Sequence, residues 1–432
     1  MQQNYKRLGD YIRLVNVRNG DDSIKELLGI NIDKFFMPSV ANVVGTDLSK
    51  YKVVSKNQFA CNRMHVGRDY RIPIAKSGSA AKFIVSPAYD VFEVIDEDEL
   101  LPDYLMLWFK RKEFDRNAWF YTDADVRGGL SWTAFSNIQF PLISIAKQKE
   151  IIEEYEAVEE RIRLNNILCE KLEETAQTLY RHWFEDFEFP YSRHCEERGT
   201  SDEAISLNGL PKVAESSAVY KLNNSPSESV GYKSSGGEMV YSEELGKEIP
   251  KGWRVGTLGE IAKIVMGQSP VGDSFNQEGV GDIFYQGRTE FGFRFPTIKT
   301  YTSESKRRAK KGEILMTVRA PVGDLNIANN DCSIGRGIAS LSSKKGKNSF
   351  LFYLLQSVKK QFDISNGEGT IFGSITKDDL HGIIVLIPEQ NIINDFNDKL
   401  EFVDIKIETV SLQNQKLEEL KSLLLGKMAV DN

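Results

Sequence analysis

The sequence predicts an α+β protein in which one globular domain is built twice in tandem, each copy followed by a long helix, with the two helices pairing. Three observations predict this. The phrase RLGDYIRLV at residues 7–15 returns as TLGEIAKIV at 257–265, heptad stripes follow Gln148 and Gln390, and a Ser- and Gly-rich stretch separates the copies. The predicted domains are residues 1–146 (first globule), 147–189 (first helix), 190–240 (linker), 241–388 (second globule) and 389–432 (second helix).

The length and composition set the broad class. A chain of 432 residues is too long for one ordinary core, so two or three folded units are expected. No run of 18 apolar residues occurs and the first twenty residues are polar, which indicates a cytoplasmic protein without a membrane span or signal peptide. The four cysteines are scattered, without a CxxC pair, so neither a disulfide framework nor a zinc site is predicted.

Both copies continue in the same order after the repeated phrase. Each has a short apolar strand followed by RxxVG, at residues 63–67 and 319–323, and then an aromatic-rich helical stretch that ends on Phe-Asp. A glycine-containing loop and a short strand, IQFPLI or GIIVLI, complete each copy, so each is expected to be one α+β globule. The repeated residues are expected to serve the shared fold, namely Leu8 and Leu258, Gly9 and Gly259, and Val15 and Val265.

Each helix carries apolar residues at alternating steps of four and three, the pattern of a heptad seam. The seam residues are Ile151, Tyr155, Val158, Ile162, Leu172 and Leu179 in the first helix, and Ile392, Phe396, Val403, Ile407, Val410, Leu417 and Leu424 in the second. A four-residue insertion near Leu400 makes a stutter. A helix over residues 148–184 would be about 55 Å long, more than a globule needs to cover itself, which favours pairing over mere covering of a core. Asn165 and Asn414 interrupt the seams and are expected to fix their register.

Residues 190–240 are rich in Ser, Gly and charge, which predicts a linker. The front part of the linker, SRHCEERGTSDEAI, resembles the short repeated peptides that mobile elements leave in bacterial reading frames. We interpret it as an insertion without function, which makes His194 and Cys195 poor candidates for chemistry.

The motifs of several enzyme classes are missing from the sequence. There are no adjacent prolines, hence no (N/D)PP(Y/F) loop of an amino-methyltransferase, and no GxxxxGK(S/T) phosphate loop. The ExK letters at Glu304-Ser305-Lys306 lie in a basic polar segment, which is a poor setting for a metal-dependent nuclease, and the four histidines support no catalytic triad. The sequence therefore predicts binding, with no catalytic residue and no metal site.

The formal net charge of −7 conceals two basic regions. Residues 50–82 carry eight Lys or Arg against one acid and residues 299–360 carry thirteen against four, whereas residues 147–188 carry six against twelve. Two basic regions in corresponding places of a repeat favour DNA as a partner over a merely solvated surface. Arg suits guanine edges, Asn and Gln suit adenine, and Lys suits phosphates. The candidate DNA-binding residues are Lys56, Asn62, Arg63, His65, Arg68, Tyr70, Arg71 and Lys76 in the first copy, and Gln286, Arg288, Lys306, Arg307, Arg308, Lys310, Arg319 and Arg336 in the second.

Two stretches carry a resemblance to a known family. RLNNILCEKLEETAQTLYRHWFEDFEFPY at residues 163–191 and YKSSGGEMVYSEELGKEIPKGWRVGTLGEIAKIVMGQSP at 232–270 resemble the specificity subunits of type I restriction-modification systems. So does IPEQ at 387–390, from which the first copy departs with IAKQ. The resemblance covers nearly the whole chain apart from the linker. It implies two target-recognition domains and two helices packed as an antiparallel coiled coil that acts as a spacer.

The resemblance also implies a function and partners. Each recognition domain would read one half of a split, asymmetric site in double-stranded DNA. Two modification subunits would hold S-adenosylmethionine and methylate adenine at N6, and restriction subunits would add translocation and cleavage that need ATP and Mg²⁺. The acidic helix faces around Glu153, Glu160 and Glu174 are the expected dock for the modification subunits. The alternatives are a stand-alone DNA-binding or scaffold protein that recruits another enzyme, and a self-sufficient methyltransferase or nuclease.

Overall fold

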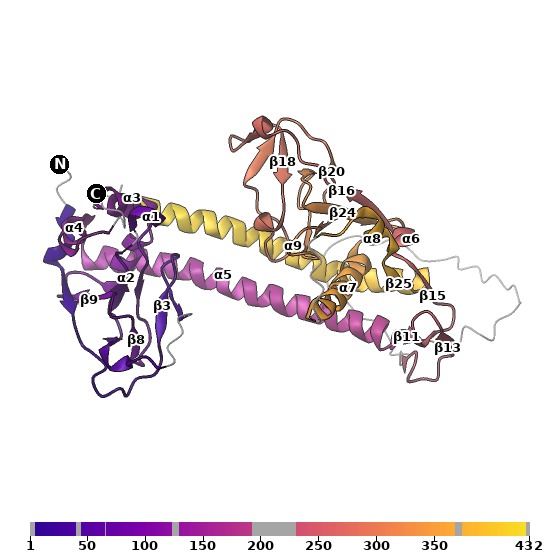
Figure 1. Cartoon of the computed structure of the whole chain (residues 1–432), viewed down its shortest axis with the longest axis horizontal. Helices are drawn as coiled ribbons and strands as arrows, with labels where there is room; N and C mark the ends of the chain where they lie inside the picture. Colours follow the sequence, from indigo (N-terminus) through magenta and orange to yellow (C-terminus); the bar gives the residue numbers. More distant parts are fainter. Residues whose placement is uncertain are drawn as a thin grey trace, which may run out of the picture. The chain divides into compact units, whose positions relative to one another are not determined.

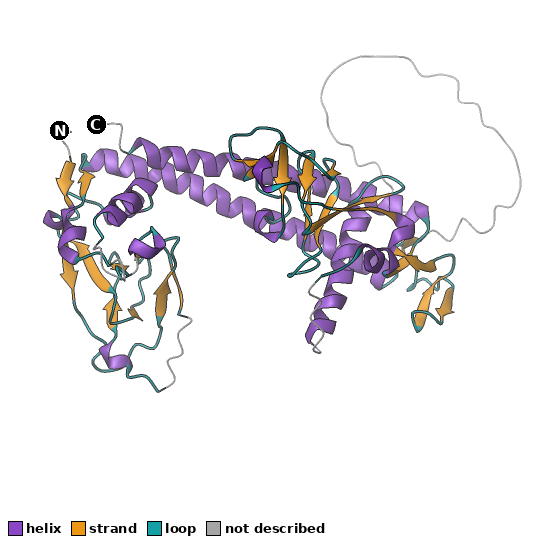
Figure 2. Cartoon of the chain, turned by 45° about the horizontal axis from the view of Figure 1, so that its top comes forward, coloured by secondary structure: helices purple, strands orange, loops and turns teal. Residues whose placement is uncertain are grey.

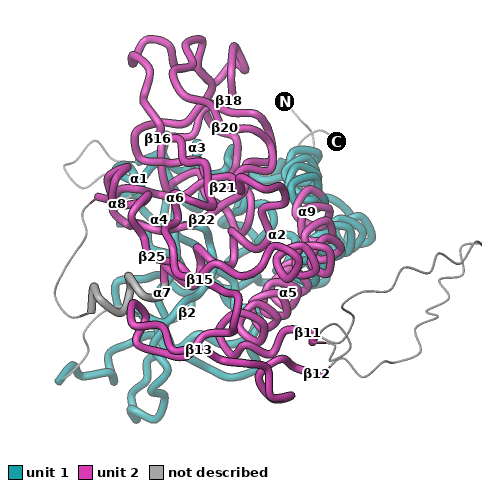
Figure 3. The backbone as a smooth tube through the Cα atoms, turned by 90° about the vertical axis from the view of Figure 1, so that its right-hand side faces the viewer, with its two compact units in different colours: residues 1–165, 413–432 teal, residues 166–412 magenta. Residues whose placement is uncertain are grey.

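The computed structural model describes residues 5–39, 45–64, 66–122, 129–191, 230–367 and 374–428, with only the backbone described for 360–367. The chain divides into two compact units, residues 1–165 with 413–432 and residues 166–412 (Figure 3). The two long helices, α5 (Ile145–Tyr180) and α9 (Gln390–Lys427), each contribute one part to each unit (Figure 1). Each unit is therefore one globule together with a piece of both helices.

The globule of the first unit is built on a four-stranded antiparallel sheet in the order β2-β9-β6-β7. Its strands are β2 (Ile12–Val15), β6 (Phe59–Cys61), β7 (Ile74–Lys76) and β9 (Asp90–Val94), beside the pairs β1 (Tyr5–Arg7) with β10 (Gln139–Pro141), β3 (Leu28–Ile30) with β4 (Phe36–Pro38), and β5 (Lys52–Val54) with β8 (Phe83–Val85). Its helices are η1 (Leu8–Asp10), η2 (Leu48–Lys50), α1 (Val66–Asp69), α2 (Pro102–Phe109), α3 (Lys112–Phe120) and α4 (Trp132–Asn137). Helix α2 is apolar nearly all round, which explains why it is almost wholly buried in the core.

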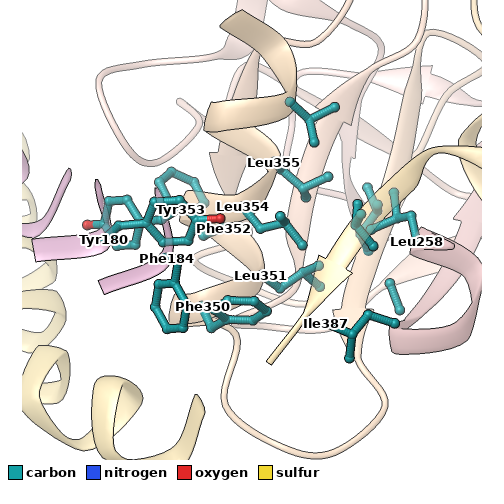
Figure 4. Packing of buried hydrophobic residues seen from close by; sticks show 14 of the residues in the cluster. Tyr180, Phe184, Leu258, Phe350, Leu351, Phe352, Tyr353, Leu354, Leu355 and Ile387 are labelled. Carbon is teal, nitrogen blue, oxygen red and sulfur yellow. The ribbon is translucent and has the colours of Figure 1, made fainter. Parts of the chain in front are cut away.

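The globule of the second unit is built on the sheet β16-β24-β21-β22 and a five-stranded sheet, β17-β19-β18-β23-β20 (Figure 2). The strands are β16 (Ala262–Met266), β17 (Phe275–Asn276), β18 (Asp282–Tyr285), β19 (Thr300–Thr302), β20 (Arg308–Ala309), β21 (Ile314–Thr317), β22 (Leu325–Ile327), β23 (Cys332–Ile334) and β24 (Ile338–Ser343), beside the pairs β11 (Pro190–Tyr191) with β12 (Val230–Gly231), β13 (Met239–Ser242) with β14 (Lys247–Pro250), and β15 (Arg254–Thr257) with β25 (Ile384–Ile387). The helices are η3 (Arg181–Glu185), α6 (Leu258–Ile261), η5 (Gly272–Ser274), η6 (Arg288–Glu290), α7 (Ser349–Gly367) and α8 (Lys377–Gly382). Figure 4 shows its core, where aromatic residues of α7 such as Phe350 meet Tyr180 and Phe184.

The two globules share one strand order, which confirms the predicted repeat. Strands β2, β6, β7 and β9 occupy the same places in their sheet as β16, β21, β22 and β24 in theirs. The outer pairs β1 with β10 and β15 with β25 correspond as well, and both are antiparallel. The five-stranded sheet is the largest difference between the copies among the described residues.

The repeated Leu-Gly has one packing role in both globules. The amides of Leu8 and Leu258 donate to the carbonyls of Ile138 and Ile383 at 2.9 and 2.8 Å, and both leucine side chains are buried. A Cβ on the glycine that follows would lie 2.8 Å from the Ser136 Cβ in the first copy and 2.5 Å from the His381 Nδ1 in the second. The glycine is needed because helix α4 or α8 approaches the backbone too closely for a side chain.

The predicted seam residues of both helices are all buried or partly buried. In the first unit, the Asn165 Nδ2 donates to the Asn414 Oδ1 at 2.8 Å, and Lys421 lies 3.8 Å from Glu159. Residue numbers rise along α5 as they fall along α9, so these helix segments run antiparallel. The predicted pairing of the seams and the register role of the two asparagines agree with these contacts.

The second unit contains the other parts of the same helices, and these also run antiparallel. Cys169 packs with Ile407 and Val410, and further along α5 the ring of Tyr180 lies 6.0 Å from that of Phe396. Past Tyr180 the chain makes the π-helical turn η3, so the regular helix ends four residues before the predicted Phe184. The predicted insertion, with His194 and Cys195, lies outside the described residues.

Candidate nucleic-acid interface

Four of the predicted DNA-binding residues of the second globule lie on neighbouring chain segments. The Gly335 amide donates to the Tyr285 carbonyl at 2.8 Å, and the Ile334 amide donates to the Arg307 carbonyl at 2.9 Å. The Val318 amide donates to the Gly337 carbonyl at 2.9 Å. These bonds bring the ends of strands β18, β20, β21 and β23 together. We call the resulting group the arginine corner; its members are Gln286, Arg307, Arg319 and Arg336.

Glycines on both sides of Arg336 allow this close approach. A Cβ at Gly335 would lie 2.7 Å from the Gln286 Oε1, and one at Gly337 would lie 2.6 Å from the Gln286 carbonyl oxygen. The contact at Gly337 is with backbone, and a real side chain would not tolerate it, whereas the Gln286 side chain can move away from a Cβ at Gly335. The GRG sequence packs its backbone against β18 while the Arg336 side chain is exposed. The predicted turn at GRG thus holds the Arg336 side chain at the surface.

The arginine corner is charged and open to solvent. All four side chains are exposed, and within the described part of the chain no carboxylate lies within 4.0 Å of the guanidinium groups of Arg307, Arg319 and Arg336. A hollow of about 500 Å³ adjoins the corner and is lined by Gln286 and Arg336 together with Ser269 and Phe275. Exposed, unpaired guanidinium groups beside a polar hollow are suited to phosphates and to guanine edges.

The other predicted cations of the second globule are paired with acids at its surface. Arg308 meets Asp282 at 2.6 Å, Lys310 meets Asp331 at 2.6 Å and Lys306 meets Glu304 at 3.6 Å. Such exposed pairs are worth at most about 1 kcal/mol, so these cations remain able to change partner.

Arg288 is held more firmly than those cations, because Asp324 accepts from both Arg288 and Lys359. Burial alone would raise the pKa of Asp324, but Lys359 and Arg288 lower the pKa below its usual value.

Arg63 of the first globule is largely enclosed by other residues. Arg63 occupies the same place in its copy as Arg319 does in the other. Each arginine follows the end of its strand by two residues: Cys61 of β6 pairs with Asp90 of β9, and Thr317 of β21 pairs with Ile338 of β24. The Arg63 Nε donates to the Asp90 Oδ2 at 2.6 Å, another nitrogen donates to the Leu130 carbonyl, and the group lies 5.7 Å from the Trp132 ring centre. The guanidinium is therefore largely enclosed by its partners within the globule, and its predicted contact with DNA stays a prediction.

Lys76 is enclosed in a similar way. Its side chain is only 12% exposed and its Nζ lies 2.8 Å from Asp103, so the lysine braces α2 against β7. Asn62 shapes a turn, because its Oδ1 accepts from the Met64 amide at 3.1 Å. Lys56 is exposed on the turn between β5 and β6, and His65 lies outside the described residues.

Arg68, Tyr70 and Arg71 are exposed on and after α1. Arg68 bonds Asp69 at 2.7 Å and Arg71 bonds Asp33 at 2.9 Å, whereas the Tyr70 ring packs edge-on against Trp119 at 5.3 Å. The structure therefore brings these three predicted residues together. Sequence reasoning missed Trp119 itself, because an aromatic residue in a helix is usually a core residue.

Sequence reasoning also missed Arg294, the most buried cation of the second unit. Its side chain is 2% exposed, ion-paired with Glu173 of α5 and, at 2.6 Å, with Asp404 of α9. The guanidinium also donates to the Tyr353 hydroxyl at 3.0 Å and covers the Phe352 ring. Arg294 thus ties the loop after η6 to both helices. The one available signal was a charged residue inside the aromatic run FGFRF.

Among the described residues, no helix is long and apolar enough to cross a membrane. No group of three or more His, Cys, Asp or Glu side chains among them is arranged to hold a metal ion. Burial raises the pKa of the Cys332 thiol to about 12, which disfavours the thiolate at neutral pH.

Comparison with known proteins finds similarity to one family. Residues 250–422 match the model of the type I restriction modification DNA specificity domain. The chain is 39% identical over 196 residues to a putative type I restriction enzyme MjaX specificity subunit of Methanocaldococcus jannaschii, a match that covers 43% of this chain and 46% of that protein. It is 21% identical to the type I restriction enzyme HindI specificity subunit of Haemophilus influenzae, over 98% of this chain and 97% of that one.

A solved structure shares the fold. The S subunit of a type I restriction-modification system from M. genitalium superposes with a TM-score of 0.53 at 13% identity, covering 98% of this chain and 95% of that one. The two chains therefore share a fold. Residues 250–422 are similar to the DNA specificity domain of type I restriction modification, and the chain is similar to specificity subunits of type I restriction enzymes.

Proposed function

We propose that this chain is the DNA-recognition subunit of a type I restriction-modification complex and reads a split, asymmetric site with one globule for each half. The observation that carries the proposal is the repeat itself. Two globules share a strand order, but at the corresponding place one has a partly buried, ion-paired Arg63 and the other an exposed Arg319. Equal folds with unequal surfaces suit a target whose two halves differ in sequence.

The chain has no active site of its own in this proposal. Two modification subunits bind S-adenosylmethionine and methylate adenine at N6, and restriction subunits supply the cleavage that needs ATP and Mg²⁺. The chain's task is to bind DNA in the cytoplasm and to hold the modification subunits over the target. Its relatives named as type I specificity subunits support this division of labour.

The faces of the helices turned away from the seam form the dock for the modification subunits. Glu153, Glu160 and Glu174 lie on exposed positions, as predicted. Large apolar side chains accompany them, among them Leu423 in the first unit and Phe402 in the second, which are 64% and 73% exposed. Exposed apolar residues on a helix already paired on its other face are typical of a surface that binds a further helix.

The test is to produce the chain together with modification subunits and to map methylated adenines across the host genome. We expect methylation at one split sequence, and only when the chain is present. Modification subunits alone serve as the control. Methylation that does not depend on the chain, although the chain binds DNA, would favour the stand-alone scaffold. Methylation or cleavage by the chain alone would reveal an enzyme.

The dock has its own test. Reversing the charges of Glu153, Glu160 and Glu174 to Lys should abolish assembly with the modification subunits, as measured by size-exclusion chromatography. The far-UV circular dichroism spectrum should be unchanged, because these side chains lie outside the seam. Intact assembly of the reversed variant would place the dock elsewhere.

A further inference from the structure

An aromatic cluster is exposed on the first globule, at the end of α3. It consists of Tyr70, Trp119, Phe120 and Tyr121, whose exposed fractions are 62%, 45%, 78% and 46%. The rings of Tyr70 and Trp119 lie 5.3 Å apart, and those of Phe120 and Tyr121 lie 5.4 Å apart. Four large rings at one place are unusual on a protein surface and mark a contact site.

The backbone conformation of Tyr70 also indicates a binding site. Its φ of 56° lies in the left-handed region, which a bulky side chain rarely adopts. A strained residue persists only where the surrounding structure demands it, and such residues gather at binding sites. Here the strain leaves the ring mostly exposed instead of burying it in the core.

The cluster lies at the same corner of the first globule as the arginine corner of the second. In the first globule, the Leu130 amide, in the chain that follows α3, donates to the Arg63 carbonyl at 3.0 Å. In the second, the Ile375 amide, in the chain that follows α7, donates to the Val318 carbonyl at 2.9 Å. The segment after the helix thus borders the RxxVG segment in both copies. In the first globule, Tyr70, three residues after Gly67 of that segment, packs against Trp119 of α3 and so places the rings at this corner.

Cations flank the rings. Arg68 and Arg71 lie on either side of Tyr70, and Arg116 lies four residues before Phe120, on the same face of α3. Their side chains are 68%, 46% and 73% exposed, and they pair with Asp69, Asp33 and Glu113 at the surface. Arg71 also lies 3.8 Å from Asp115, whose side chain is 9% exposed. Aromatic rings surrounded by arginines that can exchange their surface carboxylates for phosphates suit a nucleic acid with stacked bases.

We propose that this aromatic cluster binds the DNA of the first half-site, with Phe120 and Trp119 against an unstacked base or base step and the neighbouring arginines on phosphates. The inference rests on the proposed function and deepens it. In this proposal the second globule recognises its half-site through guanidinium groups. The first globule recognises its half-site by apolar contact and by the ease with which the base step there unstacks.

The test begins with the full chain and a pool of duplexes that carry two randomised blocks. Sequences enriched by the unaltered chain define the two halves. We then measure affinity for the enriched duplex by fluorescence anisotropy for Phe120→Ala and for Tyr241→Ala, a control that removes a 67% exposed ring from strand β13. Loss of one stacked base contact predicts about a ten-fold weaker binding for Phe120→Ala, and no change for Tyr241→Ala.

A second duplex, with the first half scrambled and the second half intact, locates the contact. Phe120→Ala and the unaltered chain should bind it equally, because the contact is already absent. Phe120→Trp should retain affinity for the complete duplex, and 2-aminopurine placed in the first half should brighten with the unaltered chain but not with Phe120→Ala. Equal binding of the complete duplex by Phe120→Ala, or an equal loss on both duplexes, would overturn the proposal. A chain that enriches no two-part sequence would instead refute the proposed function.

Discussion

At the scale of single residues, the same motif has opposite roles in the two copies. Arg63 and Arg319 both begin RxxVG, yet Arg63 lies beside Asp90 and Arg319 is exposed with Ile338 at the corresponding place. The sequence predicted the motif and its position in the repeat. Whether the arginine is enclosed or exposed depends on which residue lies opposite on the neighbouring strand, Asp90 or Ile338. The linear sequence does not reveal that strand pairing.

Alanine substitutions should separate these roles. Arg319→Ala is expected to leave stability unchanged and to cost about 1–3 kcal/mol of DNA affinity, with relaxed preference at one base position. Arg63→Ala should instead lower the free energy of unfolding by about 2 kcal/mol, because Asp90 loses a charged partner. Urea denaturation and selection from randomised duplexes measure the two effects. A sequence-independent loss for Arg319→Ala would assign that residue to a phosphate.

Arg294 offers a prediction that depends on pH. Arg294→Met should cost about 3–5 kcal/mol of stability at pH 7, because the buried Glu173 and the partly buried Asp404 lose their cation. Burial already raises the pKa of Asp404. A folded-state pKa above the unfolded value favours the protonated folded state, so this penalty is largest at neutral pH and declines as pH falls through the raised pKa.

The measurement is urea denaturation of both proteins at several pH values. The stability difference between Arg294→Met and the unaltered chain should narrow from pH 7 to about pH 5. A difference that stays constant would show that the lost packing against Phe352 and Tyr353 dominates over the buried charges.

At the scale of elements, periodicity predicted the helices better than it predicted the sheets. The seam positions follow from alternating steps of four and three, and every one is at least partly buried. The five-stranded sheet was not predicted, because its strands are two to four residues long and one pair, β18 with β23, is parallel. Strands this short carry no alternation that distinguishes them from loops.

The glycine of the repeated phrase is a test at this scale. Gly9→Ala should cost about 1–3 kcal/mol of stability, because its Cβ would press on the Ser136 Cβ and force α4 away from η1. Gly20→Ala is the matched control, since nothing lies within 4 Å of a Cβ there. Thermal unfolding of the two variants measures the difference. Equal melting temperatures would show that α4 moves without cost.

The asparagine pair of the helices offers a second test. Asn165→Leu removes the hydrogen bonds from Asn165 to Asn414 and Gln413 and is expected to cost about 1–2 kcal/mol. Changing both asparagines to Leu should cost less than the sum of the single changes, because two leucines pack together in the seam. A double-mutant cycle by urea denaturation gives the coupling energy, and strictly additive losses would mean that the two side chains act independently.

At the scale of the whole molecule, the proposed function implies that each globule recognises its own half-site and can be replaced by the globule of another specificity subunit. Replacing residues 241–388 with the corresponding globule of another specificity subunit should change one half of the methylated sequence and leave the other half as it was. The reason is that the two globules have separate cores, so neither needs the other to fold. Mapping methylated adenines for the hybrid checks this, with the unaltered chain as reference. A hybrid whose sequence changes in both halves would show that the readers are coupled, and the repeat would then serve assembly and not independent recognition.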